Sequence, residues 1–481
     1  MKYGFSSLLY LLFSAGAYAQ HETDNWYFGY SASVSFANTN PAVLTGSGMT
    51  ALSGCSSVSD PSSGQLIAYT NGVSVWDRNH QVMNNGTGLH GNPWAIQNAL
   101  IAHKPGSANT YYVFTTDGPG YGLEYSELDM TLNNGAGDIT SVKNIPVYTP
   151  AMKMLTAVSH ATAGEYWLIT HGYGNNTFAV FHISASGVSN TPVISTLGPV
   201  TGNPNDNAGG YLKASPDCRR LAMITANPTC DIFRFDPATG VVFDPISVPI
   251  GSNPFSLGFA PDSKLLYVYL EDQNDPAFTC FVYQYNLVAG TGQGIANSRV
   301  EIASTIKSIG DFKTGRDGKV YVSHASSKYL SAIGSPDSPG IACNYDAQAV
   351  FLGAGTSAYG LPNNLVSCYS ESGPLFPPPD DCFEQVPNDS IFPNIFTPNG
   401  DGINDYLTPR INIGLNDIEV LIYDRWGRKV HTGNNVSIYW EAFDMEGDAV
   451  TDGVYYWIVR GTSQCSPGSR VERHGFVHVI R

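Results

Sequence analysis

Six segments of the chain repeat one pattern: a short strand, a turn built from Pro, Gly, Asp or Ser, and a second strand rich in Tyr, Val and Leu. They read "SSVSDPSSGQLIAYT", "LIAHKPGSANTYYVFTT", "AVSHATAGEYWLITH", "LKASPDCRRLAMITA", "LGFAPDSKLLYVYLE" and "DFKTGRDGKVYVSHA". Their turns recur about every 45 to 57 residues, close to the length of a four-stranded propeller blade. The repeat predicts an all-β chain with a β-propeller over residues 20–370.

A further blade is predicted from the two ends of this region. The stretch "SAYGLPNNLV" (357–366) resembles the first strand of a unit, and "NWYFGYSASVSFAN" (25–38) supplies two alternating strands that would complete it. Six complete blades and this composite blade make a seven-bladed propeller, with six blades as the alternative. A β-sandwich array or a β-helix also repeats, but its units are shorter or bury a different side, so we favour the propeller.

The segments that flank the propeller have other compositions. Residues 1–19 have the charge, apolar run and Ala17-Tyr18-Ala19 cleavage site of a signal peptide. No later stretch approaches the roughly 20 apolar residues of a membrane helix, so we expect no direct membrane insertion. Residues 371–389 are rich in Pro and acidic groups and predict a linker. From 390 to 481 short strands resume, as in a small immunoglobulin-like sandwich.

Charge and cysteine content limit the partners and the compartment. A net charge of −16 argues against nucleic acid and anionic lipid as partners. Eight cysteines fit an oxidising compartment. Cys218 and Cys230 are expected either to pair across a hairpin or to remain buried free thiols.

Three blocks near the end of the chain carry a resemblance to a known family. The blocks "FPNIFTPNGDGINDYL", "VLIYDRWGRKVH" and "YWEAFDMEGDAVTDGVYYWIV", followed by "GFVHVIR", resemble the gliding-motility-associated, or type B, C-terminal sorting domain of secreted Bacteroidota proteins. "NWYFG", "GVSVWDRNHQVM" and "YGLPNNLV" are similar to the WD40-like propellers that accompany it. The motif positions are Thr397, Pro398, Asn399, Gly400, Asp401, Gly402, Asn404, Asp405, Tyr423, Trp426, Gly427, Trp440, Gly453 and Tyr455.

The resemblance implies export by the type IX secretion system. The secretion machinery would then be a partner, and the protein would lie outside the cell or on its surface. An Asp-Ser-apolar triplet at Ser390 also resembles the O-glycosylation site of Bacteroidota proteins.

The stretch "NIFTPNGDGINDYL" invites a calcium interpretation. Asn399, Asp401, Asn404 and Asp405 place oxygen ligands at close intervals, as hard cations require. The twelve-residue loop that ends in a bidentate Glu is missing, however, and Asx and Gly residues also form turns without metal. We therefore favour a turn or recognition role, with calcium as the alternative and no other cofactor expected.

No catalytic motif stands out in the sequence. It has no Gly-x-Ser-x-Gly elbow, Walker loop or zinc spacing of His and Cys. His103 and His160 precede turns, while His171 and His324 follow second strands, which favours structural roles. The aromatic residues Trp76, Trp94, Trp167, Tyr111 and Tyr112 either contact sugar or protein or, as is commoner, pack in cores.

These observations favour an exported binding or adhesion protein whose propeller presents loops to a glycan or a protein. The alternatives are a carbohydrate-active hydrolase or lyase on the same scaffold and a structural component of a surface or gliding apparatus. Enzymatic activity is not predicted, although a pair of carboxylates in the middle of the ring would change that.

Overall fold

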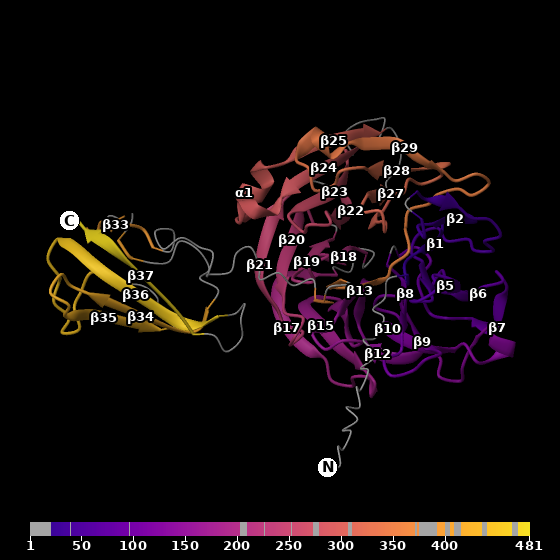
Figure 1. Cartoon of the computed structure of the whole chain (residues 1–481), viewed down its shortest axis with the longest axis horizontal. Coiled ribbons are helices and arrows are strands. Elements are labelled where there is room, and N and C mark those ends of the chain that lie inside the picture. The colour runs from indigo at the N-terminus through magenta and orange to yellow at the C-terminus, as the bar shows by residue number, and fades with distance from the viewer. Residues whose placement is uncertain are drawn as a thin grey trace, which may run out of the picture. The chain divides into compact units, whose positions relative to one another are not determined.

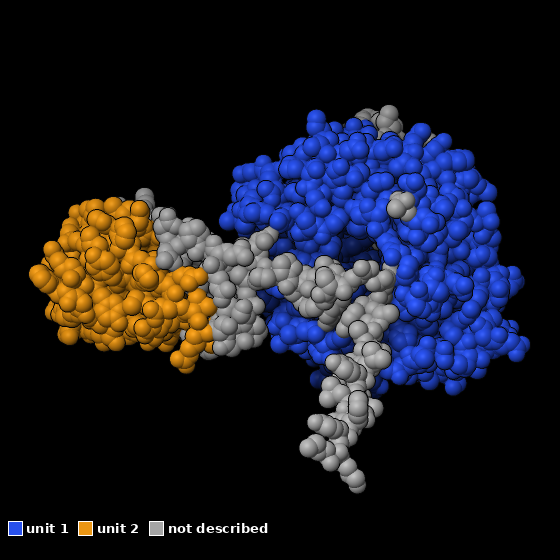
Figure 2. Space-filling model, in the orientation of Figure 1, with its two compact units in different colours: residues 1–375 blue, residues 376–481 orange. Residues whose placement is uncertain are grey.

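The chain divides into two compact units, residues 1–375 and 376–481 (Figure 2). The computed structural model describes residues 21–481 except 39, 96, 203–208, 226, 252, 273–278, 306–309, 371–372, 375–391, 400–404, 408–414, 435–439 and 464–469. The predicted signal peptide, most of the predicted linker and Ser390 lie outside the described residues. No helix in the described part of the chain is long and apolar enough to cross a membrane.

The first half of unit 1 consists of small sheets built mainly from antiparallel strands that follow one another in the chain (Figure 1). Their strands are β1 (Asn25–Phe28), β2 (Ala32–Ser35) and β3 (Ala42–Val43); β4 (Ser56–Ser59), β5 (Leu66–Thr70), β6 (Ser74–Asp77) and β7 (Val82–Thr87); β8 (Ala99–His103), β9 (Thr110–Thr116), β10 (Leu123–Asp129), β11 (Asp138–Ile139) and β12 (Ile145–Tyr148); and β13 (Ala151–Ser159), β14 (Tyr166–Gly172), β15 (Asn175–Ser184), β16 (Gly187–Val188) and β17 (Val193–Thr201).

The same organisation continues through the second half of unit 1. The strands are β18 (Tyr211–Ala214), β19 (Arg220–Ile224), β20 (Thr229–Phe235) and β21 (Val242–Pro249); β22 (Pro254–Phe259), β23 (Leu265–Glu271), β24 (Cys280–Asn286) and β25 (Val300–Thr305); and β26 (Phe312–Thr314), β27 (Val320–Val322), β28 (Tyr329–Ile333) and β29 (Tyr345–Phe351). The short helix α1 (Gly292–Asn297) lies between β24 and β25, and 3-10 turns occupy Asn133–Gly135, Leu287–Ala289 and Gly340–Cys343.

The repeated segments are the hairpins that begin six of these sheets. β4 pairs with β5, β8 with β9, β13 with β14, β18 with β19, β22 with β23 and β26 with β27, each antiparallel across the predicted turn. The sheets follow one another around a common middle (Figure 1). The predictions of an all-β chain and of a β-propeller are confirmed.

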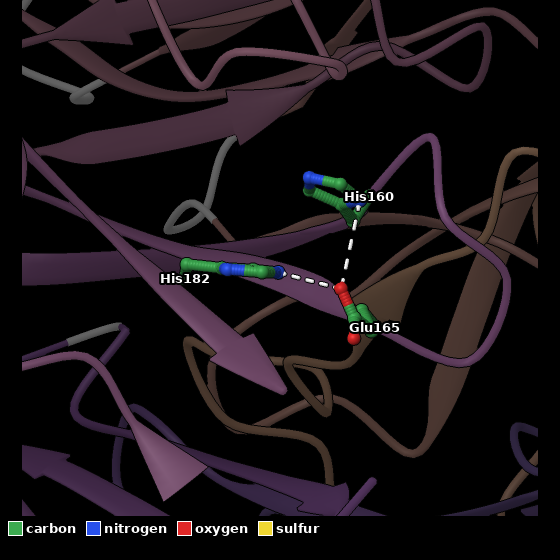
Figure 3. A group of neighbouring side chains, drawn as sticks. All are labelled: His160, Glu165 and His182. Atoms are coloured by element: carbon green, nitrogen blue, oxygen red, sulfur yellow. Dashed lines mark hydrogen bonds and ion pairs between the residues drawn. The ribbon is translucent and has the colours of Figure 1, made fainter. Parts of the chain in front are cut away.

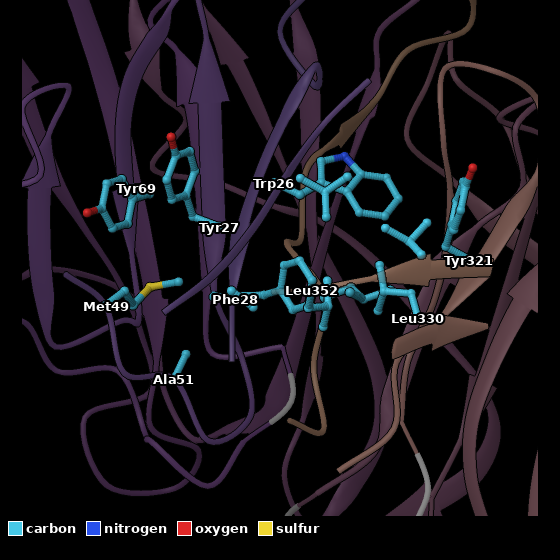
Figure 4. Packing of buried hydrophobic residues seen from close by; sticks show 14 of the residues in the cluster. Trp26, Tyr27, Phe28, Met49, Ala51, Tyr69, Tyr321, Leu330 and Leu352 are labelled. Carbon is cyan, nitrogen blue, oxygen red and sulfur yellow. The ribbon is translucent and has the colours of Figure 1, made fainter. Parts of the chain in front are cut away.

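The first and last sheets of unit 1 share one apolar cluster (Figure 4). Trp26 and Phe28 of β1 lie in it with Tyr321 of β27, Leu330 of β28 and Leu352, and all five side chains are buried. The rings of Trp26 and Tyr321 meet edge to face with centroids 5.9 Å apart. Burial of large aromatic and aliphatic side chains is the main favourable term in folding, so this cluster fastens the beginning of the propeller to its end.

Residues 356–368 cross the middle of unit 1, and we call them the crossing segment. Thr356 exchanges two backbone hydrogen bonds with Tyr30, at 2.8 and 3.0 Å. Further along, the backbone N–H of Asn363 donates to the carbonyl of Cys55 at 2.8 Å, and its side-chain amide donates to the carbonyl of Leu155 at 3.0 Å. The crossing segment therefore contacts strands that belong to different sheets.

The prediction that 357–366 forms the first strand of a blade completed by 25–38 is wrong in its pairing. Only β30 (Leu365–Val366) is a strand, and it lies parallel to β13. The crossing segment meets the N-terminal sheet at the bridge between Tyr30 and Thr356 and shares its buried cluster through Leu361, but β30 itself pairs with β13. After β30, Cys368 forms a disulfide with Cys218 in the turn between β18 and β19, and β31 (Tyr369–Ser370) pairs with β32 (Gly373–Pro374).

Unit 2 has its own sheet and core. The sheet has the order β33 (Ile395–Phe396), β37 (Arg470–Val479), β36 (Gly453–Ser463), β34 (Leu415–Tyr423) and β35 (Lys429–Asn434). Trp440 and Leu407 bridge each other outside these strands and join the buried cluster. The other buried members are Phe392, Phe396, Val420, Ile422, Val430, Ala442, Val450, Tyr455, Trp457, Val459, Val471, Val477 and Val479.

Candidate functional site

The middle of the propeller holds charged groups that already have partners. The Lys213 ammonium lies 2.6 Å from a carboxylate oxygen of buried Asp311 and donates to the carbonyl of Phe312 at 2.7 Å. Lys313 donates to the side-chain oxygen of Asn364 in the crossing segment at 2.6 Å. Desolvation, together with the positive charge of Lys213, lowers the pKa of Lys313 to about 7. These contacts occupy the groups that a ligand in the middle would need.

Four of the five aromatic residues considered for ligand contact are packed inside the protein. Trp76, Trp167, Tyr111 and Tyr112 are buried, as the commoner fate of such residues predicts. Trp94 differs, because 70% of its surface is exposed. It follows Gly91, Asn92 and Pro93 in the loop between β7 and β8, so turn-forming residues surround it.

Tyr121, in the loop between β9 and β10, is a second exposed aromatic residue near this loop, with 55% of its surface exposed. The two loops are tied together, because the Asn92 amide donates to the Asp117 carboxylate at 2.7 Å and the Asn92 N–H donates to the Thr116 carbonyl at 3.1 Å. We call the surface formed by Trp94, Tyr121, Asn92 and Asp117 the aromatic loop surface. It carries two exposed aromatic side chains and two polar ones.

A partly buried hydrogen-bond network lies next to Tyr121. Its ring stacks on His90 with centroids 3.9 Å apart and an interplanar angle of 17°. His90 is held at both nitrogens, by the Glu124 carboxylate 2.9 Å from Nδ1 and by the Asn144 amide 3.2 Å from Nε2. A ring fixed in this way loses little conformational entropy when a ligand binds.

One histidine of the repeat belongs to a polar cluster on the hairpin formed by β13 and β14 (Figure 3). Nε2 of His182, on β15, lies 2.8 Å from a Glu165 oxygen, and Nδ1 of His160 lies 3.9 Å from the same oxygen. No spacing in the sequence indicates this group, because His182 comes from the neighbouring strand. His171 is buried, where desolvation lowers its pKa to about 4, which fits the structural role expected for it.

Only part of the candidate calcium stretch can be placed. The backbone N–H of Asn399 donates to the side-chain oxygen Oδ1 of Asp405 at 3.0 Å. Gly400, Asp401, Gly402 and Asn404 lie outside the described residues. This contact brings Asn399 and Asp405 together, and the calcium interpretation stays a prediction.

The sorting motif residues fall into two groups in unit 2. Trp440 and Tyr455 are buried, and each donates a hydrogen bond to a nearby carbonyl, of Phe443 and of Thr451, both at 2.7 Å. Trp426 is 85% exposed. It follows Asp424 in a turn closed by Gly427, whose φ of 81° suits glycine.

The two later motif blocks meet at a hollow of about 210 Å³ on unit 2. Trp426, Gly453 and Tyr455 contribute to its wall together with the charged side chains of Asp424, Arg425, Arg428, Asp444 and Asp452. Blocks separated in the sequence therefore form one continuous surface. A partner that binds the motif would contact the exposed motif residues at this hollow.

Comparison with known proteins identifies unit 2. The CHU_C type IX secretion signal domain matches residues 390–479. No curated protein matches the sequence.

Three solved structures show distant similarity. PorZ of Porphyromonas gingivalis, an essential surface component of the type IX secretion system, shares 12% identity over 94% of this chain and 63% of its own (TM-score 0.32). The β-propeller domain of Cps50 (Swd1) from Myceliophteria thermophila shares 9% over 63% of this chain and 94% of its own (TM-score 0.37). A protein of unknown function from Desulfotomaculum acetoxidans DSM 771 shares 12% over 62% and 95% (TM-score 0.30). These scores are too low to add to the fold assignment, which rests on the sheets themselves.

The match and the clustering of the motif residues agree on the role of unit 2. The sequence resemblance to a sorting domain is confirmed. The chain is therefore a β-propeller protein that carries a type IX secretion signal domain at residues 390–479, and it is exported across the outer membrane to the cell surface or the extracellular space.

Proposed function

We propose that the exported protein binds a polysaccharide through the aromatic loop surface of a seven-bladed propeller. The three-stranded sheet of β1 to β3 acts as the seventh blade, in addition to the six sheets that begin with a repeated hairpin. Unit 2 is an immunoglobulin-like sandwich whose exposed motif residues contact the secretion machinery. The exposure of Trp94 and Tyr121 on two loops that Asn92 and Asp117 join is the observation that carries the binding proposal.

The chemistry of this surface suits a sugar ring. The C–H face of a pyranose is apolar and stacks on an aromatic ring, while its hydroxyl groups need hydrogen-bond partners. Trp94 and Tyr121 offer the rings, and Asn92 and Asp117 offer amide and carboxylate groups on the same two loops. Exposing two large aromatic rings to water is unfavourable in the absence of a ligand, so binding gains the free energy of covering them.

The middle of the propeller is the less suitable place for a ligand. The crossing segment fills it with backbone that is hydrogen-bonded to several sheets, and the Asp311 carboxylate is paired with Lys213. A glycosidase needs two carboxylates free to act as acid and base or nucleophile. The paired state of Asp311 therefore favours binding over hydrolysis.

The proposal is tested by affinity electrophoresis and calorimetry of the purified full chain against a panel of neutral soluble polysaccharides. We expect retardation by at least one polymer, and we expect Trp94→Ala and Tyr121→Ala each to weaken binding by about 10-fold or more, since a stacked aromatic anchor contributes about 1.5 kcal/mol or more. Phe351→Ala is the control, because Phe351 is also 55% exposed but lies on β29.

Two results would contradict the proposal. One is binding that survives in the Trp94→Ala/Tyr121→Ala double variant with unchanged affinity. The other is release of reducing sugar from the retained polymer, which would indicate a hydrolase.

A further inference from the structure

His160 and Glu165, between β13 and β14, and His182 on β15 bring three ligand atoms together. One nitrogen from each of His160 and His182 and one oxygen of Glu165 all lie within 4.8 Å of one another. The side chains are partly exposed, at 13% for His160, 34% for His182 and 25% for Glu165 (Figure 3). A small ion from solvent can reach all three.

The distances within this group are close to those between the ligands of one metal ion. Zinc bonds of about 2.0 to 2.2 Å to nitrogen and oxygen place two tetrahedral ligands about 3.3 Å apart. The Glu165 oxygen is 2.8 Å from His182 Nε2 and 3.9 Å from His160 Nδ1, so the required separation lies between the two. Rotations of partly exposed side chains suffice to equalise them.

We propose that His160, Glu165 and His182 bind a divalent transition metal ion of the zinc class. Imidazole nitrogen combined with one carboxylate is a ligand set that suits zinc, cobalt and nickel and is poor for calcium or magnesium. Three protein ligands leave one tetrahedral position, which solvent or an external ligand fills. The site is separate from the aromatic loop surface and does not depend on the proposed function.

Other parts of the fold hold the hairpin in place. The carbonyl of Pro237, in the turn between β20 and β21, accepts the N–H of Ala161 at 3.0 Å and the indole N–H of Trp167 at 2.8 Å. The Asp236 carboxylate in that turn accepts hydrogen bonds from the backbone N–H of Ala238 and from the hydroxyl of Thr239, so it stabilises the turn in which it lies.

Metal binding has to displace two existing interactions. The ion replaces the proton shared by His182 and Glu165, and it also replaces the N–H of Thr162, which donates to His160 Nδ1 at 2.8 Å. Thr162 lies in an exposed turn, so water can accept its N–H instead. The imidazoles also have to turn, because they now stack with centroids 4.5 Å apart and an interplanar angle of 27°.

Trp167 provides a local reporter. Its ring centroid lies 4.9 Å from those of both His160 and His182. A paramagnetic ion such as Co²⁺ or Ni²⁺ bound there should quench its fluorescence. The Trp167→Phe variant should lose most of this quenching but still bind the ion.

The experiment uses the purified full chain, stripped with a chelator and titrated with Zn²⁺ in a calorimeter and with Co²⁺ in the spectrophotometer and fluorimeter. We expect one equivalent of Zn²⁺ with micromolar or tighter affinity. His182→Gln and Glu165→Gln should each weaken it by about 10-fold or more. His103→Gln is the control, because His103 ends β8 before the corresponding turn and belongs to no such group among the described residues.

Three outcomes would overturn the proposal. The first is that the protein shows no saturable binding at equimolar Zn²⁺. The second is that His182→Gln and Glu165→Gln both bind Zn²⁺ with unchanged affinity. The third is that the bound equivalent of Zn²⁺ is lost only in His474→Gln or His478→Gln. The last outcome would place the ion on β37. Circular dichroism of each variant separates loss of binding from loss of folding, and Glu165→Gln preserves the shape of the side chain.

Discussion

Cys218 and Cys368 form a disulfide between Cα atoms 5.9 Å apart, across 150 residues of sequence. The bond attaches the end of the crossing segment to the turn between β18 and β19. The pairing of Cys218 with Cys230 that a hairpin would allow is wrong, because Cys230 is a buried free thiol on β20 and Cys218 lies in the turn on the other side of β19. An oxidised pair agrees with a protein that leaves the cytoplasm.

Removal of this disulfide should destabilise unit 1. A cross-link over a loop this long restricts the unfolded chain, and we expect Cys368→Ser to lower the free energy of unfolding by about 2 to 5 kcal/mol. Urea unfolding followed by circular dichroism measures the change. Reductant should destabilise the wild type to a similar extent and leave the Cys218→Ser/Cys368→Ser variant unaffected; equal sensitivity of both proteins would show that the bond does not stabilise the fold.

Lys313 should make the stability of unit 1 rise with pH above neutrality. Its pKa is lowered from 10.5 to about 7 in the folded protein, first by desolvation and then by Lys213. Between pH 7 and 10.5 the Lys313 amine is protonated in the unfolded chain and largely neutral in the folded protein. The free energy of unfolding therefore increases as pH rises through this window, and below pH 7 this residue adds no pH dependence.

This prediction is tested by measuring urea unfolding midpoints at several pH values above 7. The highest pH stays below the range in which tyrosines ionise. Lys313→Met should be less dependent on pH in that window and relatively more stable at its lower end. Glu22, whose pKa burial raises to about 7, titrates at the lower end of this window, so the slopes are compared well above pH 7. An identical slope in the wild type and in Lys313→Met would refute the assignment.

Trp426 should matter for export and not for folding. Because 85% of its surface is exposed beside the hollow of unit 2, Trp426→Ala should change the free energy of unfolding by less than about 0.5 kcal/mol. We expect the variant to accumulate in the periplasm, measured by fractionation and immunoblotting. Tyr456→Ala, at a 51% exposed position on β36, is the control and should be exported normally.

Deletion of residues 391–481 should leave a folded propeller that stays in the periplasm. Unit 1 has its own buried clusters and its disulfide lies within it, so its thermal transition should persist. Export requires the signal domain matched at 390–479. Recovery of the truncated protein from the culture medium would contradict the sorting role.

Calcium should not change the thermal stability of unit 2 if Asn399 and Asp405 form only a turn. Differential scanning calorimetry with calcium and with a chelator should give the same transition temperature. Asp405→Asn retains an oxygen acceptor for the Asn399 N–H and should cost less than about 1 kcal/mol. An increase in the transition temperature with calcium that Asp405→Asn abolishes would restore the metal interpretation.

Local patterns predicted the hairpins well. Turn residues and alternating apolar residues act within a dozen positions, so "APDSK" between two apolar runs identifies the turn from β22 to β23 without knowledge of the rest. The same reasoning explains Trp94, since Gly91, Asn92 and Pro93 indicate a loop. Trp167 sits in an apolar run and is buried.

Contacts between distant segments could not be predicted in this way. The partner of Cys218, the position of His182 beside Glu165 and the pairing of β30 with β13 depend on which strands the ring places side by side. No spacing in the sequence encodes that arrangement. The candidate calcium residues show that a local pattern can also be ambiguous. The closely spaced polar residues that include Asn399 and Asp405 are as typical of a turn as of a calcium site.

The crossing segment has a consequence for the order in which the protein assembles. Ser56 donates to the carbonyl of Asn363 and Ser159 to that of Val366, contacts that span 307 and 207 residues. Such high contact order slows folding, and these contacts can form only after residues 356–368 have been synthesised. The propeller can therefore complete its central contacts only when synthesis has nearly reached the signal domain. A chain that ends before the crossing segment lacks these contacts.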